Sequence, residues 1–296
     1  MNEYSKLTRV SAFGKLIRPS QQIKNGAVLL GALGSGTLLN WDASVRTLLT
    51  ILCWITLSGA IYILNDISDL KTDRNHPVKS MRPLAASLVT IKQAWLIAFF
   101  LVLISLSLAN SLDSRIFVIA IMYLVINTLY SAFLKNVAVI DLLFVSSGFV
   151  LRGLSGIYAV DALPSLWFLL LSLFGSLLLI SGKRLSQKNE IAINSKSHRA
   201  SIDNYSENFL IQLQTICSTG LLICYLMMTQ EKNVDSDVQR ILLDFSIVPF
   251  LAIIVYINYF QDKYKESDIT QLMFNRKPFT LAVFIWFVLF LSSLVA

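Results

Sequence analysis

The chain has little charge and few of the residues that build covalent or metal frameworks. Only 15% of its 296 residues are charged, whereas a soluble globular domain carries about a quarter. Its three cysteines lie in apolar runs without CxxC spacing, and it has only two histidines. These scarcities argue against a soluble domain, a disulfide framework and a zinc site.

What the chain has instead is hydrophobic length, with 55% of its residues apolar. Nine runs approach the roughly 20 residues that a membrane-spanning helix needs. The sequence therefore predicts an all-α polytopic membrane protein that forms one transmembrane domain over residues 1–296. The predicted spans are 25–41, 45–65, 90–109, 114–133, 138–159, 164–182, 208–229, 240–260 and 279–296.

Residues 1–24 are polar and basic, so we expect no secretory signal before the first span. Within this segment, residues 5–18 have the pattern of an amphipathic helix at the membrane surface. Its expected lipid-facing residues are Leu7, Val10, Phe13, Leu16 and Ile17.

The net charge of +7 follows from membrane orientation. If the N-terminus is cytoplasmic, 20 of the 25 lysines and arginines lie on the cytoplasmic side, 4 lie outside and Arg152 lies within a span. This bias predicts a cytoplasmic N-terminus and an outside C-terminus, in a bacterial inner membrane, with no need for a nucleic-acid partner. The long polar segments 66–89, 183–207 and 261–278 then become cytoplasmic loops, which places function at that face.

Residues 65–73 carry the strongest chemical signal. Asp66, Asp69 and Asp73 are spaced i, i+3 and i+7, which puts them on one face of a helix, and Asn65 is one turn before Asp69. Crowded carboxylates near lipid are costly unless a cation relieves them. Mg²⁺ suits such an oxygen cluster. The alternative is a solvated helix end, which the position at a membrane boundary disfavours.

Three basic residues follow this acidic face, and with it they form a recognisable motif. His76, Lys79 and Arg82 supply cations for the rest of a diphosphate. The segment 65–83 resembles the first aspartate-rich motif of the UbiA-type intramembrane prenyltransferase superfamily, NDxxDxxxDxxxxxxxxRP. The resemblance implies a nine-helix bundle, phosphate contacts from Lys79 and Arg82, and catalytic aspartates at the metal. The implied Mg²⁺-diphosphate ligands are Asn65, Asp66, Asp69 and Asp73.

A second aspartate-rich motif, usual between the sixth and seventh helices of that superfamily, is missing. The corresponding region has Lys183 and Arg184, which replace a metal site by an anion site. The alternative is an ordinary positively charged cytoplasmic loop. GKR followed by an HR…YS segment resembles the polyprenyl-phosphate phosphoribosyltransferase branch, although Gln187 stands where that branch usually has glutamate.

Polar residues also interrupt the fourth and fifth spans. Tyr123, Asn127 and Tyr130 form a stripe that leads to Lys135, and a stripe of this kind normally faces a bundle interior or cavity. We interpret Tyr130 and Lys135 as substrate-binding, whereas Asn127 equally suits a bond between helices. The pattern LYSxxLKxxxxxD…GFVLRGLSG also resembles the phosphoribosyltransferase branch.

Three further charged residues, Asp141, Arg152 and Lys24, are candidates for a structural or a binding role. Asp141 and Arg152 lie about three turns apart in the fifth span, too far to touch, and we favour a structural pairing of Arg152 over anion binding. Residues 18–25 resemble the family's RPxQWxKN segment, with Gln22 where tryptophan is common. Lys24 in this segment is predicted to contact phosphate, with an interfacial lysine as the alternative.

The resemblance implies Mg²⁺-dependent transfer of 5-phosphoribose from phosphoribosyl diphosphate to a polyprenyl phosphate at the cytoplasmic face. The alternatives are prenyl transfer to an aromatic or quinone precursor, which predicts the missing second motif, and a non-catalytic lipid or anion transporter. A homo-oligomer is compatible with each. The predicted substrate-binding residues are Lys24, Lys79, Arg82, Tyr130, Lys135, Lys183 and Arg184.

Overall fold

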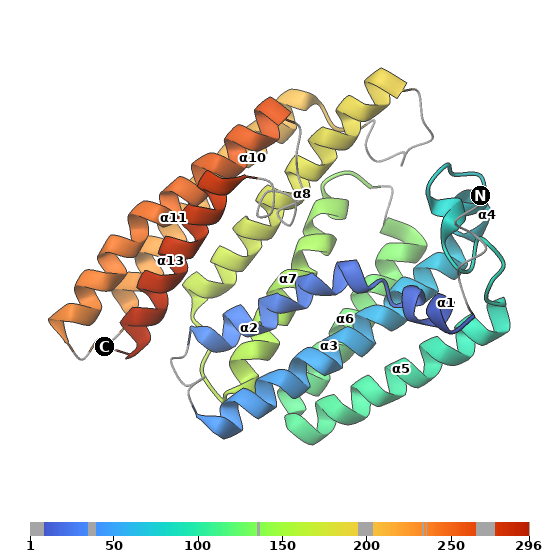
Figure 1. Cartoon of the computed structure of the whole chain (residues 1–296), viewed down its shortest axis with the longest axis horizontal. Coiled ribbons are helices and arrows are strands. Elements are labelled where there is room, and N and C mark those ends of the chain that lie inside the picture. Colours follow the sequence, from blue (N-terminus) through green and yellow to red (C-terminus); the bar gives the residue numbers. More distant parts are fainter. Residues whose placement is uncertain are drawn as a thin grey trace. The chain divides into compact units, whose positions relative to one another are not determined.

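A computed structural model of the chain describes residues 9–34, 40–134, 137–194, 204–232, 234, 236–264 and 276–295. All regular elements of this described part are helices (Figure 1). The elements are α1 (Arg9–Leu16), η2 (Pro19–Asn25), α2 (Gly26–Leu33), α3 (Trp41–Ser68), α4 (Leu70–Arg74), η4 (Lys79–Met81), α5 (Ile91–Leu112), α6 (Ser114–Leu129), η5 (Tyr130–Leu134), α7 (Ile140–Ala159), α8 (Leu166–Asn194), α10 (Glu207–Glu231), α11 (Asp237–Tyr264) and α13 (Lys277–Val295).

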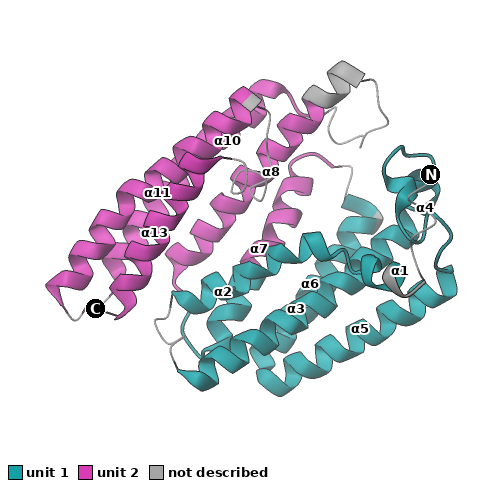
Figure 2. Ribbon diagram, viewed as in Figure 1, with its two compact units in different colours: residues 1–134, 151–163 teal, residues 135–150, 164–296 magenta. Residues whose placement is uncertain are grey.

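The chain divides into two compact units (Figure 2). Unit 1 comprises residues 1–134 and 151–163, and unit 2 comprises residues 135–150 and 164–296. The boundary falls inside α7, so that each unit contains part of this helix. Each unit has a hydrophobic core of its own, and each is described by itself below.

Unit 1 is built around α3, which runs beside α5 over much of its length (Figure 1). Asn40 caps α3 by accepting a hydrogen bond from the backbone of Asp42, and Thr90 forms a capping box with Gln93 at the start of α5. The fully buried Trp54 of α3 lies in a core that also includes residues of α2, α5, α6 and α7. The end of α3 where the acidic motif lies packs in a second cluster, in which Ile63 lies with Leu70 and Leu84.

Two glycines bring the backbones of α2 and α7 into direct contact. A Cβ atom on Gly156 would lie 1.9 Å from the carbonyl oxygen of Val28, and one on Gly31 would lie 2.0 Å from that of Gly153. Only glycine fits at such a crossing, as in small-residue contacts between membrane helices.

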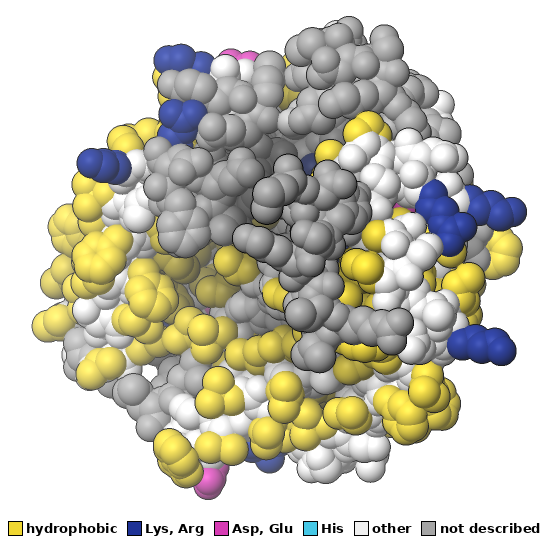
Figure 3. All heavy atoms as spheres, turned by 45° about the vertical axis from the view of Figure 1, so that its right-hand side comes forward, with side chains coloured by type: hydrophobic (Ala, Val, Ile, Leu, Met, Phe, Trp, Pro, Cys, Tyr) yellow, Lys and Arg dark blue, Asp and Glu magenta, His cyan; other side chains and the backbone are white. Residues whose placement is uncertain are grey.

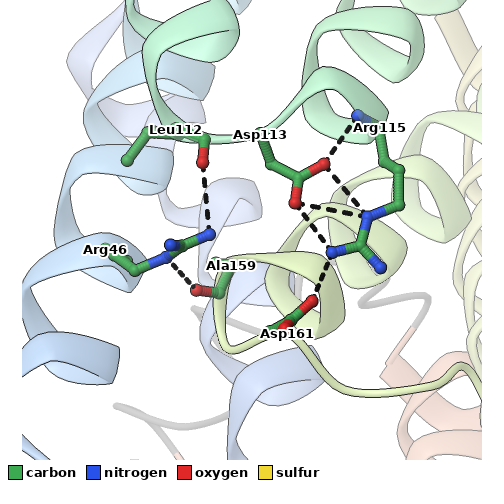
Figure 4. Close-up of polar contacts among 6 residues, drawn as sticks. All are labelled: Arg46, Leu112, Asp113, Arg115, Ala159 and Asp161. Carbon is green, nitrogen blue, oxygen red and sulfur yellow. Dashed lines mark hydrogen bonds and ion pairs between the residues drawn. The ribbon is translucent and has the colours of Figure 1, made fainter.

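A polar cluster ties the opposite end of α3 to its neighbours (Figure 4). Arg46 donates to the backbone carbonyls of Ala159 and Leu112, at the ends of α7 and α5. Arg115, at the start of α6, pairs with Asp113 and Asp161. The hydrogen bonds from Arg115 lower the pKa of the Asp113 carboxyl. These contacts satisfy carbonyls that the helix ends leave open.

Unit 2 joins α8 to α10 and α11 to α13. Its core contains apolar residues from α7, α8, α10 and α11, with Phe279 from α13. Polar pairs cross between α10 and α11 along their length, as they do in membrane bundles where hydrogen bonds join helices. The pairs are Gln214 with Gln261, Ser218 with Asn258, and Tyr225 with Ser246.

Seven described helices are long and apolar enough to cross a membrane, and α6 is a shorter apolar helix. The chain is thus a multi-pass integral membrane protein. The first predicted span, 25–41, appears as the short α2, and residues 35–39 lie outside the described residues. Nine spans therefore remain a prediction. The face in Figure 3 carries broad areas of hydrophobic side chains with lysine and arginine at its margin, as lipid contact requires.

Two local predictions were wrong. The loop predicted from residue 183 is helical as far as Asn194, because Gly182 is followed by good helix formers and the side chains of Arg184 and Leu185 are buried against the unit 2 core. In the N-terminal segment, α1 does not turn Leu16 to lipid. Leu16 is fully buried in a cluster with Ile63, because α1 packs against α3.

Candidate active site

Two buried carboxylates, one near the end of α3 and one in α4, share one arginine. Asp66 is 3% exposed and Asp73 is 2% exposed. The Arg82 Nη1 atom lies 3.0 Å from Asp66 Oδ1 and 2.5 Å from Asp73 Oδ2. Three of the predicted site residues are thus brought together in unit 1, although the sequence alone did not indicate that Arg82 would bridge the acids.

The acidic motif crosses a junction between two helices. The helix α3 ends at Ser68 and α4 begins at Leu70, with Asp69 between them at φ −91° and ψ 5°. Helical hydrogen bonds nevertheless continue through it, because Asp69 N donates to Asn65 O and Asp73 N donates to Asp69 O, each at 2.9 Å. The helical hydrogen bonding of the motif therefore continues across the break.

Asn65 connects this motif to the end of α6. Its Oδ1 atom accepts a hydrogen bond of 2.7 Å from the hydroxyl of Ser131. Ser131 belongs to the π-helical turn η5, which begins at Tyr130. Such turns often occur at functional sites. The predicted Tyr130 thus starts the turn whose next residue holds a predicted metal ligand, and Ser131 is a site residue that sequence reasoning did not single out.

Arg18 also reaches the acidic motif and was missed. Its Nη2 atom pairs with Asp66 Oδ1, the same oxygen that Arg82 contacts. The guanidinium lies 5.2 Å from the centre of the Tyr62 ring on α3. The RPxQWxKN resemblance contained this arginine, but 48 residues separate it from Asp66 and no local pattern joins the two.

The other predicted cations of unit 1 have different surroundings. Lys79 is exposed in η4, and Lys24 is half-buried at the end of η2. His76 stabilises the loop between the acidic motif and Lys79, because its Nδ1 atom accepts backbone hydrogen bonds of 3.2 Å from Val78 and Lys79.

In unit 2, the predicted anion-binding pair divides into a buried and an exposed residue. The Arg184 guanidinium makes two hydrogen bonds to the fully buried Asp141, from Nε at 2.8 Å and Nη2 at 3.0 Å. Its Nη1 atom donates to Gln187 Oε1 at 2.8 Å. Lys183 is exposed on α8. Gln187 thus bonds to Arg184 at the position where the phosphoribosyltransferase branch that the sequence resembles usually has glutamate.

Tyr205 forms hydrogen bonds in the same part of unit 2. Its hydroxyl accepts a 2.8 Å hydrogen bond from the backbone of Val139, and its carbonyl accepts one from Lys188. Burial raises the pKa of the Tyr205 phenol. The predicted Lys135 lies outside the described residues.

Arg152 has a structural setting in unit 1. It donates to Asn25 Oδ1 at 2.7 Å and to the hydroxyl of Tyr123 at 3.0 Å, and it lies over the rings of Trp54 and Tyr123. This fits the structural pairing that we favoured. Asn127 bonds to the Tyr123 carbonyl of its own helix at 2.8 Å.

The oxygen ligands of the motif suit Mg²⁺ in kind. The carboxylates of Asp66 and Asp73 and the amide oxygen of Asn65 are hard donors, and Mg²⁺ takes few protein ligands and fills its octahedron with water or phosphate. Among the described residues, no three histidine, cysteine, aspartate or glutamate side chains are close enough to hold a metal ion in this arrangement. The two acids instead hold guanidinium groups.

Comparison with known proteins places the chain in a family. The model of the UbiA prenyltransferase family matches residues 26–192. The chain is 34% identical over 220 residues to the decaprenyl-phosphate phosphoribosyltransferase of Mycolicibacterium smegmatis, which covers 73% of this chain and 69% of that protein. It is 30% identical over 250 residues to the protein of the same name from Corynebacterium glutamicum, covering 82% and 74%. The chain therefore belongs to the UbiA prenyltransferase family.

Solved structures confirm the fold. The structure of a UbiA homologue from Archaeoglobus fulgidus bound to DMAPP and Mg²⁺ matches with a TM-score of 0.72 at 17% identity, covering 95% of this chain and 98% of that one. The predicted resemblance to the family and to its phosphoribosyltransferase branch is thus confirmed, and the chain is a transferase. Sequence reasoning succeeded here because the acidic motif is long and local.

Proposed function

We propose that the chain transfers 5-phosphoribose from phosphoribosyl diphosphate to a polyprenyl phosphate, with Mg²⁺ as cofactor. The observation that carries the proposal is the cluster of Asp66 and Asp73 with two arginines at one end of α3. The names of the relatives support the donor and the acceptor. The lysine and arginine at 183–184, in place of a second acidic motif, support a substrate pair that carries several phosphates.

The reaction requires one bond to form and one to break. An oxygen of the lipid phosphate attacks the anomeric carbon of the ribose, and the bond from that carbon to the diphosphate breaks, so that its electron pair leaves with the diphosphate. The attacking phosphate is already ionised, which removes the need for a general base. Mg²⁺ bound by Asn65, Asp66, Asp69 and Asp73 would stabilise the charge that grows on the leaving group.

The chain's cations hold the phosphates. Arg82 lies beside the acids and Lys79 is exposed in the following loop, so both are proposed to bind the diphosphate. Lys183, exposed on α8, is proposed to bind a substrate phosphate directly. Arg184 is held in place by its hydrogen bonds to Asp141, and its positive charge is proposed to stabilise that phosphate. Lys24, Tyr130 and Lys135 complete the proposed set.

We further propose that the chain forms one UbiA-like domain of nine spans with its N-terminus in the cytoplasm. The bias of lysine and arginine supports this orientation. The active site would then face the cytoplasm of a bacterial cell, on the inner membrane, where a water-soluble phosphoribosyl donor is made. The orientation is tested by replacing Asp42, at the other end of α3, with cysteine. The D42C variant should react with an impermeant thiol reagent from outside intact cells.

The activity is tested with purified protein in detergent, labelled phosphoribosyl diphosphate and a polyprenyl phosphate. We expect label in the lipid phase that requires both the lipid phosphate and Mg²⁺ and disappears with EDTA. A parallel reaction contains a labelled prenyl diphosphate and an aromatic acid. Prenylation of the acid without phosphoribosyl transfer would overturn the proposal and return the chain to ordinary prenyl transfer.

A further inference from the structure

Arg18 occupies an unusual place for a residue outside the acidic motif. It comes from the segment between α1 and η2, yet its guanidinium pairs with Asp66, which is 3% exposed. With Arg82, it gives the two buried carboxylates of Asp66 and Asp73 two positive partners. The cluster is therefore neutral as it stands, although the motif has the ligand chemistry of a divalent cation site.

The two arginines and a metal ion compete for the same atom. Arg18 and Arg82 both contact Asp66 Oδ1. A cation coordinated by this oxygen would face two guanidinium groups at contact distance, and the positive charges would repel. Metal binding through Asp66 Oδ1 therefore requires at least one arginine to leave this oxygen. A released guanidinium needs another anion, and phosphate oxygens match its planar fork.

The backbone of Arg18 is held in a conformation that L residues avoid. Arg18 has φ 52° and ψ 70°, in the left-handed region, and is followed by Pro19. Such outliers persist only where the surroundings enforce them, and they are concentrated at functional sites. A strained turn that delivers a guanidinium to a metal-type motif is therefore evidence for a role of that guanidinium.

Gln22 enforces the turn. Its Nε2 atom donates to the Ile17 carbonyl at 2.5 Å, directly before Arg18. Its Oε1 atom accepts from Asn25 at 2.7 Å and from Ser58 on α3 at 2.9 Å. Asn25 is itself held by Arg152. The base of Arg18 is thus anchored to two long helices, while its side chain remains 25% exposed and able to reorient.

We propose that Arg18 is a substrate-binding residue: when the metal binds, its guanidinium leaves Asp66 and binds the diphosphate of the donor. The exchange makes binding of the metal and the diphosphate cooperative. The metal releases Arg18 from Asp66, and the diphosphate then gives Arg18 a new partner. Gln22 acts as the positioning residue that keeps Arg18 beside the site. The inference rests on the proposed function, since it assumes a diphosphate donor.

The test measures binding separately from turnover, with the full chain in detergent. Binding of Mn²⁺ alone is followed by its free-ion paramagnetic resonance signal, and binding of labelled inorganic pyrophosphate at saturating Mg²⁺ by equilibrium dialysis. In the Arg18→Gln variant we expect pyrophosphate affinity to fall about tenfold or more, as for loss of a charged hydrogen bond. Mn²⁺ affinity should stay equal or rise, because one competing cation is gone.

Two further variants keep the test sharp. Lys15→Gln removes the same charge from an exposed position on α1 and should change neither affinity. Arg18→Lys keeps the charge without the fork and should bind pyrophosphate with intermediate affinity. A wild-type protein that fails to bind pyrophosphate with Mg²⁺ would overturn the proposed function. If the wild type binds but Arg18→Gln binds pyrophosphate equally well, or loses both ligands together, the role of Arg18 is overturned.

Discussion

The guanidinium of Arg184 on α8 forms two hydrogen bonds with the carboxylate of Asp141 on α7, and both side chains are buried. Two charges that are costly within an apolar bundle thus neutralise each other. The pair also changes the role of Arg184. A guanidinium bonded to both Asp141 and Gln187 is held in a fixed orientation, which suits a residue that must present charge at a defined place.

Breaking this pair from one side should destabilise the protein strongly. Asp141→Ala leaves a buried guanidinium without its carboxylate, at a cost of about 3–5 kcal/mol. Replacing both residues, in the Asp141→Leu/Arg184→Met variant, removes the two buried charges together and should restore part of the lost stability. Thermal unfolding in detergent of the wild type, Asp141→Leu, Arg184→Met and the double variant measures the coupling. Additive effects of the two substitutions would contradict it.

Asp73 should be required for turnover. Asp73→Ala removes one of the two carboxylates beside Arg82, and we expect phosphoribosyl transfer to fall by at least about a hundredfold. Asp42→Ala is the matched control, because Asp42 is exposed at the start of α3, away from the acidic motif. Activity is measured as label in the lipid phase, alongside thermal unfolding. Near-normal turnover in Asp73→Ala would remove this residue from the site.

The crossing of α2 and α7 should not tolerate a methyl group. A Cβ on Gly156 would lie 1.9 Å from the Val28 carbonyl, so Gly156→Ala must separate the two backbones and should cost about 1–3 kcal/mol or more. Gly26→Ala is the control, because nothing lies within 4 Å of a Cβ there. The two midpoints of thermal unfolding are compared. Equal midpoints would show that the helices separate at little cost.

The polar cluster in Figure 4 predicts a pH dependence. Hydrogen bonds from Arg115 lower the folded-state pKa of Asp113, so their contribution to stability is complete above the ordinary aspartate value and is lost as the pH falls through the lowered one. The midpoint difference between wild type and Arg115→Gln should therefore be present at pH 7. It should shrink once the pH is below about 4. A difference that stays constant down to pH 3 would mean that Asp113 is not its source.

The sequence predicted most of the helices and the chemistry of the acidic motif because both are local. Runs of apolar residues, such as those of α5 and α10, specify membrane helices by length and hydropathy alone. The spacing of Asp66, Asp69 and Asp73 specifies a common face wherever helical hydrogen bonds continue, and they do continue through the break at Asp69. The excess of lysine and arginine on one side of the membrane is found by counting these residues in the alternate predicted loops.

The missed features depend on contacts between distant segments. The sequence predicted a loop from Lys183, but burial of Arg184 and Leu185 extends α8 beyond the apolar run, because packing adds to the helix propensity of the following residues. Arg18 begins the segment that resembles RPxQWxKN, but no local pattern in that segment places it against Asp66.

By itself, then, the sequence determined the membrane helices, the acidic face with its oxygen ligands and the family to which the chain belongs, because each is written in residues close along the chain. Only the tertiary structure decided which cations meet which acids. Arg18 lies 48 residues from Asp66, and Asp141 lies 43 residues from Arg184 in the sequence, and the packing of α3 and of α8 brings each pair together. Charge pairing acts through space, so no local pattern specifies it.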